Sequence, residues 1–162
     1  HKTWVHEGGI ATPMIVHWPA RIDAALEPIA SPGHVVDIAP TLLEIAATNN
    51  PATEALWSGP SQPGQSLAPQ WAQQSNPGES SKDRILWWQH EANRALRQGD
   101  WKIVAAGKEA PWELYNLAND RSETINLALD QPEVLERLVG IWDQWTERFR
   151  VQATAVEGPD AQ

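Results

Sequence analysis

The sequence contains no cysteine, and its basic residues are outnumbered by acidic ones. It holds 12 Lys and Arg against 21 Asp and Glu, which gives a formal net charge of -9 at pH 7. The lack of cysteine excludes disulfides, thiolate metal sites and a cysteine nucleophile within these 162 residues. The acidic balance disfavours nucleic acid and anionic membranes as partners, because both carry the same sign of charge.

Long apolar runs are also missing. No run approaches the roughly 18 residues of a membrane-spanning helix, so we expect no membrane span. The hydrophobic content of 41% and the charged content of 20% are values typical of a globular chain with a packed core. The sequence begins with His1 and shows no signal-peptide pattern, so we expect a mature piece or a fragment.

The first half of the sequence predicts one strand and one helix, as in an α/β layer. Pro13–Trp18 is a short apolar run between turn signals, which favours a buried strand of a parallel sheet, with His17 in the core. A helix is predicted over Val35–Ala47, with Asp37 as its N-cap and Pro40 in its first turn. Its apolar face would consist of Leu42, Leu43, Ile45 and Ala46.

The second half predicts a small antiparallel sheet covered by a helix. The strand candidates are Arg84–Trp88, Arg94–Arg97, Trp101–Val104 and Trp112–Tyr115. A tight turn at Gln98–Asp100 joins two of them, and alternation places Trp87 and Trp88 on opposite faces. The apolar stripe of Gln131–Arg150 predicts an amphipathic helix with Asp130 at its N-cap. We expect a frayed acidic tail from Ala153 onward.

Between these halves, residues 51–82 are rich in Gly, Pro and Ser and predict a long loop or linker. We therefore predict two parts. Residues 1–75 would hold the end of an α/β domain and the loop-rich connection. Residues 76–162 would hold the antiparallel-sheet subdomain with its terminal helix and acidic tail.

The residues alone do not supply a complete catalytic set. The histidines are His1, His6, His17, His34 and His90. His6-Glu7 runs directly into Gly8-Gly9, which breaks the helix that an H-E-x-x-H metal site requires, so a metal site built from these residues is disfavoured. No nucleophile elbow, P-loop or dinucleotide motif is present.

Five segments, in order, resemble the sulfatases, the arylsulfatase family of the alkaline-phosphatase-like fold. Their patterns are K-x-x-x-x-E-G-G-x-x-x-P, D-[IL]-x-P-T-[IL]-[IL], G-x-S-L, R-x-G-x-[WY]-K and [WE]-L-Y-[DN]-L followed by E-x-x-N-L-A. The matching segments are Lys2–Pro13, His34–Glu44, Gly64–Leu67, Asn93–Val104 and Trp112–Ala128. Each pattern alone is weakly specific, but their shared order over roughly residues 1–150 indicates this family.

The resemblance implies an α/β fold, namely the C-terminal fragment of an alkaline-phosphatase-like sulfatase fold with a small antiparallel sheet packed by a C-terminal helix. It also implies hydrolysis of sulfate esters by a formylglycine made from Cys or Ser in a C/S-x-P-x-R motif. Beside it lies a divalent cation, usually calcium, held by Asp and Asn. The motif and the metal ligands lie upstream in the family and are absent from this sequence. We therefore expect the C-terminal part of a sulfatase, cut just before Lys2, inactive alone and without its own metal site.

One active-site residue carries over from the resemblance. Lys2 lies at the position of the family lysine that contacts the sulfate, where an ammonium stabilises the negative charge that develops on oxygen. Gly8 and Gly9 are expected to allow, with Glu7, the turn that presents this lysine. His90 and Asn93 lie on a strand connection that faces the catalytic cleft in relatives. They are candidate contacts to the organic part of the substrate, with a purely structural role as the alternative.

The expected partner is a sulfated small molecule or glycan, with neither nucleic acid nor membrane as a partner. Two alternatives stay open. The parent could be a phosphonate or phosphodiester hydrolase of the same superfamily, or the chain could be a non-catalytic binding remnant of a sulfatase. By family resemblance the protein would be periplasmic or secreted. The sulfated substrate and the oligomeric state are left open.

Overall fold

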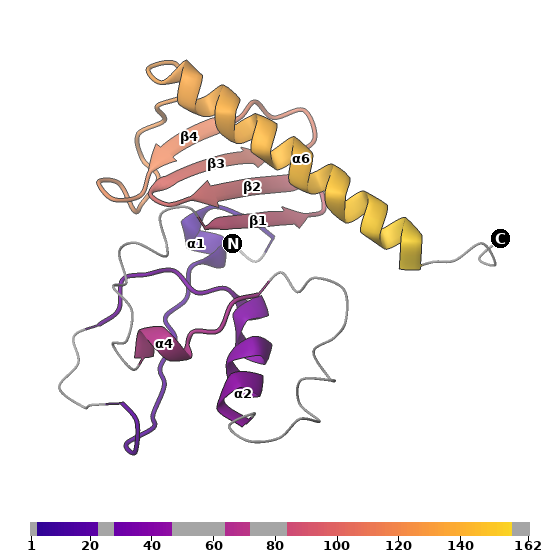
Figure 1. The fold of residues 1–162 in the computed structure, drawn as a ribbon. Coiled ribbons are helices and arrows are strands. Elements are labelled where there is room, and N and C mark those ends of the chain that lie inside the picture. The colour runs from indigo at the N-terminus through magenta and orange to yellow at the C-terminus, as the bar shows by residue number, and fades with distance from the viewer. Residues whose placement is uncertain (1–2, 23–27, 47–63, 72–83, 157–162) are drawn as a thin grey trace. The chain divides into compact units, whose positions relative to one another are not determined.

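The structure is a computed structural model that describes residues 3–22, 28–46, 64–71 and 84–156 (Figure 1). The chain divides into two compact units: residues 1–13 with 83–162, and residues 14–82. The predicted division near residue 75 keeps the first residues with the first half, whereas the structure groups residues 1–13 with the sheet. Within the described ranges, no helix combines the length and apolar character needed to cross a membrane.

The first unit contains a four-stranded antiparallel sheet in the order β1-β2-β3-β4. Its strands are β1 (Ile85–His90), β2 (Asn93–Gln98), β3 (Trp101–Ala106) and β4 (Glu113–Asn116). Gln98 pairs with Trp101 across a tight turn, and Gly99 supplies the positive φ of 59° that this turn requires. The predicted sheet and its hairpin turn are therefore confirmed, with the first two strands meeting at the hairpin His90–Asn93.

Helix α6 (Pro132–Val156) lies across one face of this sheet (Figure 1). Leu138 is fully buried among Leu96, Ile103 and Leu114, one from each of three strands. This confirms the amphipathic helix predicted from the apolar stripe. The predicted frayed tail is wrong at its start, because the helix continues from Ala153 to Val156, and residues 157–162 lie outside the described part of the chain.

Aromatic side chains extend the packing between α6 and the sheet. Trp87 stacks on Trp142 with ring centroids 6.1 Å apart and contacts Phe149 at 4.9 Å. Its Nε1 donates a hydrogen bond of 3.2 Å to Thr146 Oγ1, which satisfies the indole in this half-buried position. Trp88 packs against the cluster on the opposite face, so the predicted alternation of the two tryptophans is confirmed.

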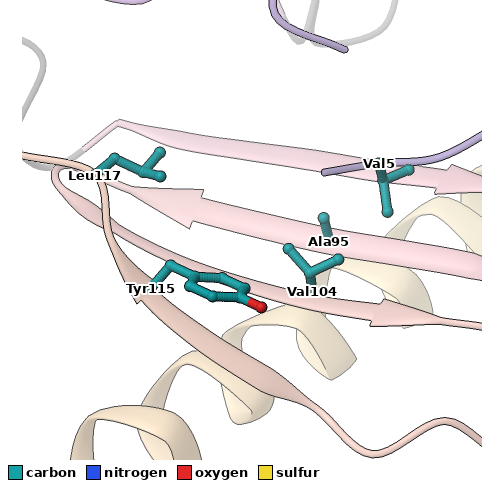
Figure 2. Close-up of a cluster of buried hydrophobic side chains, with 5 residues drawn as sticks. All are labelled: Val5, Ala95, Val104, Tyr115 and Leu117. Atoms are coloured by element: carbon teal, nitrogen blue, oxygen red, sulfur yellow. The ribbon is translucent and has the colours of Figure 1, made fainter. Parts of the chain in front are cut away.

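The face of the sheet opposite α6 has its own buried cluster (Figure 2). It consists of Val5, Ala95, Val104, Tyr115 and Leu117. Val5 comes from the N-terminal segment and is only 2% exposed, although it is far in sequence from every strand that it packs against. This face is therefore covered by the beginning of the chain, including Ile10 of the short helix α1 (Glu7–Ile10), rather than by a long helix such as α6.

The predicted strand Pro13–Trp18, which lies in the second unit except for Pro13, is wrong. These residues form no strand, Ile15 is 93% exposed, and His17 is exposed rather than buried in a core. An apolar run becomes a sheet strand only where a neighbouring strand pairs with its backbone groups. No strand pairs with it within the part of the chain that the structure describes.

The predicted helix of this unit is present in two pieces, a 3₁₀ turn at Val35–Asp37 and helix α2 (Ile38–Ala46). The N-cap is His34 rather than Asp37, whose carboxylate instead accepts a bond from the His34 backbone N–H at 2.7 Å. The expected apolar face is incompletely buried, since Leu42 is exposed. Thr41 is the helix's buried residue.

The G-x-S-L segment docks on the start of this helix. Gln65 N donates to the Asp37 carboxylate at 2.9 Å, and Leu67 N donates to Thr41 Oγ1 at 2.8 Å. At Gly64 a Cβ would lie 2.1 Å from the Val36 carbonyl oxygen, so this contact admits only glycine. A short helix α4 (Ala68–Trp71) follows the segment. Two of the five patterns thus form one contact within this unit.

Candidate functional site

The predicted catalytic residue Lys2 lies outside the described residues, and the chain is described from Thr3 onward. The Asn93 side chain donates a hydrogen bond of 2.9 Å from Nδ2 to the Thr3 carbonyl oxygen. Two residues later, Val5 is buried in the cluster of Figure 2. The backbone next to Lys2 is therefore fixed to the sheet by one polar and one apolar contact.

The E-G-G part of this segment forms a single helical turn, α1 (Glu7–Ile10). Neither Gly8 nor Gly9 has a positive φ, and a Cβ at Gly8 would meet nothing within 4 Å. The predicted turn is therefore present, but the expectation that it depends on the backbone freedom of glycine is wrong. The turn is held instead by the side chain of Glu7 and by its backbone N–H.

Lys102 is the centre of this attachment. Its side chain is fully buried, and its Nζ lies 2.8 Å from Glu7 Oε1 and 2.8 Å from Glu123 Oε1. The two carboxylate side chains are themselves 12% and 3% exposed. The Glu7 backbone N–H also donates to Glu123 Oε2 at 2.6 Å, which joins the two acids directly. A buried ammonium is thus compensated by two buried carboxylates.

Two arginines flank this ion cluster. The exposed Arg121 lies 3.8 Å from Glu7 Oε2 and adds a weak, solvent-screened attraction. Arg97 pairs with Lys102 in the sheet register, and burial lowers the pKa of Arg97, while the nearby Glu7 carboxylate opposes that shift. The two acids therefore have three basic side chains near them, those of Lys102, Arg97 and Arg121.

The backbone at Glu123 is strained. Its φ is +54°, a region that non-glycine residues adopt at a cost of about 1–3 kcal/mol. The turn that contains Glu123 is stabilised by Asp120, whose carboxylate accepts bonds from the N–H groups of Ile125 and Thr124, each 2.8 Å long. These bonds, the Ile125 one foremost, lower the pKa of Asp120. The loop is therefore shaped so that the Glu123 carboxylate reaches Lys102.

A second polar group lies beside the first. His6 Nε2 lies 2.8 Å from Glu113 Oε2, and the Tyr115 hydroxyl donates to the same oxygen at 2.9 Å. Burial and this hydrogen bond raise the pKa of Tyr115, because ionisation would place two negative charges together. The buried His6 Nδ1 has no hydrogen-bond partner among the described residues. Residues 6 and 7 are thus both tied to the sheet by side chains.

Three of the sulfatase-like segments therefore meet at one place. Glu7 belongs to the first segment, Lys102 to the strand pair and Glu123 to the last, and the two contacts of Glu7 span 95 and 116 residues of sequence. No pattern in the sequence predicted this cluster. The one available signal was Lys102 within an apolar strand, where alternation puts it on the same face as the core residue Val104.

The two substrate-contact candidates lie at the neighbouring hairpin. His90 and Asn93 are directly paired across β1 and β2, so their side chains share the face that carries the N-terminal segment. His90 is exposed, whereas Asn93 is half-buried and uses its amide for the Thr3 carbonyl. Glu91, at the hairpin tip, has a φ of +54°. The structure brings Asn93 to the segment of Lys2, and a role of either residue in substrate binding stays a prediction.

An open groove of about 490 Å³ lies on the other side of this hairpin. Its lining residues are Gln89, Glu91, Ala92, Arg94, Lys108 and Trp142. The Arg94 guanidinium donates to the carbonyls of Gly107, Lys108 and Ala110 at 3.0–3.1 Å, so it holds the β3–β4 loop. Since Arg94 and Trp142 belong to the face covered by α6, the groove is separate from the attachment of the N-terminal segment.

The described residues do not fit a calcium site. They contain no group of three His, Asp or Glu side chains placed to hold a metal ion. The closest buried carboxylates, Glu7 and Glu123, are bridged by Lys102, whose ammonium occupies the position that a cation would take. We therefore assign no metal chemistry to these residues.

Comparisons with known proteins agree with the five segments. The profile of the family described as "N-sulphoglucosamine sulphohydrolase, C-terminal" matches residues 1–148. An uncharacterized sulfatase of Schizosaccharomyces pombe is 31% identical over 148 residues, which cover 87% of this chain and 26% of the relative. Arylsulfatase K of Danio rerio is 30% identical over 148 residues, which cover 85% of this chain and 26% of the relative. The chain thus spans about a quarter of the length of these relatives.

Solved structures share the fold at low sequence identity. Ps i-CgsB in complex with k-i-k-neocarrahexaose aligns with a TM-score of 0.61 at 22% identity and covers 80% of this chain and 27% of its own. BT4656 in complex with its substrate D-glucosamine-2-N,6-O-disulfate aligns with a TM-score of 0.53 at 20% identity, covering 84% and 28%. The predicted fold class, an α/β sulfatase fold with a small antiparallel sheet and a C-terminal helix, is confirmed.

Proposed function

Because the chain belongs to the N-sulphoglucosamine sulphohydrolase C-terminal family, we propose that it is the C-terminal part of an enzyme that hydrolyses sulfate esters. The observation that carries the proposal is the convergence of the motif residues Glu7, Lys102 and Glu123 on the segment that follows Lys2. This segment is held to the sheet at Thr3, Val5 and Glu7. A segment held in this way is suited to presenting a neighbouring side chain in a fixed place.

Within this proposal, Lys2 contacts the sulfate group of the substrate. Negative charge grows on the sulfate and leaving-group oxygens as the ester bond breaks, and a fixed ammonium stabilises it more in the transition state than in the ground state. The formylglycine nucleophile and calcium that the family resemblance implies would be supplied by residues outside this sequence. The chain's own contribution is therefore a positioned cation and the structure that holds it.

We further propose a sulfated sugar or another sulfated small molecule as the substrate. Support comes from the two solved structures with the same fold, one in complex with k-i-k-neocarrahexaose and one with D-glucosamine-2-N,6-O-disulfate. His90 and Asn93, at the hairpin beside the N-terminal segment, are the candidate contacts to the organic part. The family resemblance also supports export to the periplasm or the exterior, which cell fractionation of the native host would test.

The direct test is Lys2→Ala in the full-length enzyme, assayed on an aryl sulfate. Loss of one charge-stabilising donor should lower kcat by about 100- to 1,000-fold. Lys108→Ala is the matched control, because its side chain is exposed and lies on the opposite side of the sheet from the N-terminal segment. Near-normal kinetics of Lys2→Ala would refute the assigned role.

The same enzyme distinguishes the alternatives. A phosphonate or phosphodiester hydrolase would turn over aryl phosphonates or diesters faster than the aryl sulfate. Residues 1–162 alone should be inactive on every ester, because they contain neither cysteine nor a C/S-x-P-x-R motif. Turnover of an aryl sulfate by this chain alone would contradict the proposal that the nucleophile and calcium are supplied by residues outside this sequence.

A further inference from the structure

The ion cluster around Lys102 is placed to do more than stabilise the fold. Burying an ammonium and two carboxylates carries a large desolvation cost, and well-packed apolar side chains commonly stabilise a core as well or better. The charged groups also fix the positions of the segments that carry them, because each ion pair joins one particular atom of one segment to one particular atom of another. Here the fixed segments are β3, the turn at Glu7 and the loop at Glu123.

The cluster is arranged so that the cation is indispensable. Glu7 and Glu123 are buried together, joined by the bond from the Glu7 N–H to the Glu123 carboxylate. Without Lys102 these two negative charges would repel each other in a site of low dielectric. The strained φ of Glu123 would also lose the contact that holds it. Removal of the ammonium should therefore release the Glu7 turn from the sheet.

A continuous set of contacts leads from this turn to Lys2. Glu7 is held by Lys102, Val5 is buried against the sheet, and the Thr3 carbonyl accepts the bond from Asn93. Thr3, Val5 and Glu7 are thus each held to the sheet, and Glu7 is the first residue of α1. Thr3 is joined to Lys2 by one peptide bond. A shift of the Glu7 turn would therefore also act on Thr3, the residue bonded to Lys2.

We propose that Lys102 is a positioning residue for Lys2: it touches no substrate and acts by clamping the Glu7 turn to the sheet. This inference rests on the proposed function, because it requires the Lys2 ammonium to act on the sulfate. Displacement of a catalytic group by about 1 Å can cost on the order of 100-fold in rate. Loss of the clamp should therefore lower turnover although Lys102 lies outside the reacting atoms.

The test is a double-mutant cycle between Lys102→Met and Lys2→Ala in the full-length enzyme, with kcat/KM measured on an aryl sulfate. If Lys102 acts through Lys2, Lys102→Met should lower kcat/KM by about 10- to 100-fold when Lys2 is present. In the Lys2→Ala background the same substitution should lower kcat/KM by less than about 3-fold, because the ammonium that Lys102 would position has already been removed. Lys108→Met should leave kcat/KM unchanged in both backgrounds.

A purely structural role gives a different pattern. If Lys102→Met only reduced the fraction of folded enzyme, it would lower activity by the same factor in both backgrounds, and that result overturns the proposal. Should Lys102→Met fail to fold, Glu7→Gln keeps the shape of the side chain and removes half of the charge contact, and the same cycle applies. If Lys2→Ala lowers kcat/KM strongly and Lys102→Met lowers it by the same factor in both backgrounds, only the positioning role is refuted. A negligible effect of Lys2→Ala refutes the proposed function itself.

Discussion

The two faces of the sheet are held by different kinds of interaction. On one face, α6 buries Leu138 and a set of tryptophans in an apolar layer with few directed bonds. On the other face, the N-terminal segment is attached through the fully buried Lys102 and its two carboxylates. Apolar burial is nearly independent of direction, whereas each ion pair specifies particular atoms. The comparison indicates that α6 supplies stability and that the opposite face supplies placement.

The largest effect on stability is expected from removing the cation. Lys102→Met leaves two buried carboxylates without a partner and should reduce the free energy of unfolding by about 3–5 kcal/mol. Urea unfolding of the full-length enzyme, followed by tryptophan fluorescence, measures this change. Replacing Lys102, Glu7 and Glu123 together by Met, Leu and Leu should recover most of the loss. No recovery would mean that charge balance is not the cause.

The apolar face should respond to the loss of volume alone. Leu138→Ala removes a fully buried side chain between α6 and three strands and should cost about 2–5 kcal/mol of unfolding free energy. Leu129→Ala is the matched control, because Leu129 is 95% exposed and should change stability by less than about 0.5 kcal/mol. Equal effects of the two substitutions in urea unfolding would contradict the assignment of the core.

The smallest effect concerns alkaline pH at Tyr115. Burial and the bond to Glu113 raise the pKa of Tyr115 above its ordinary value of about 10, so the folded state keeps the proton that the unfolded state loses. This contribution to stability is complete below that ordinary pKa and decreases as pH rises above it. Unfolding free energies measured between pH 8 and 11 should fall less steeply in Tyr115→Phe. Identical slopes would contradict the role of Tyr115.

The α6 face could be predicted from sequence because its signals are local. The apolar stripe of Gln131–Arg150 repeats at the helical period, and Gly99 marks a tight turn between two alternating strands. Each of these patterns lies within a few residues of its own element. The apolar run Pro13–Trp18 is an equally local pattern, but a strand also needs a neighbouring strand to pair with. None pairs with it among the described residues, and the predicted strand was wrong.

The opposite face could not be predicted in this way. Lys102 and Glu7 are 95 residues apart, and nothing in either local sequence identifies the other. The family resemblance marked both residues as parts of motifs but assigned the E-G-G segment a backbone role, which Gly8 and Gly9 do not have. A buried ion pair depends on the tertiary fold. The structure was therefore needed to show what the motif glutamates bind.

The most direct test of this account is amide hydrogen exchange in the full-length enzyme with Lys102→Met. The reporting amides are Glu7, bonded to Glu123, and Gly9 and Ala11, bonded within the turn to His6 and Glu7. If Lys102 clamps the N-terminal segment, these amides should lose protection while those in the middle of α6 keep it. Unchanged protection at Glu7, Gly9 and Ala11, or an equal loss of protection throughout α6, would contradict the central claim.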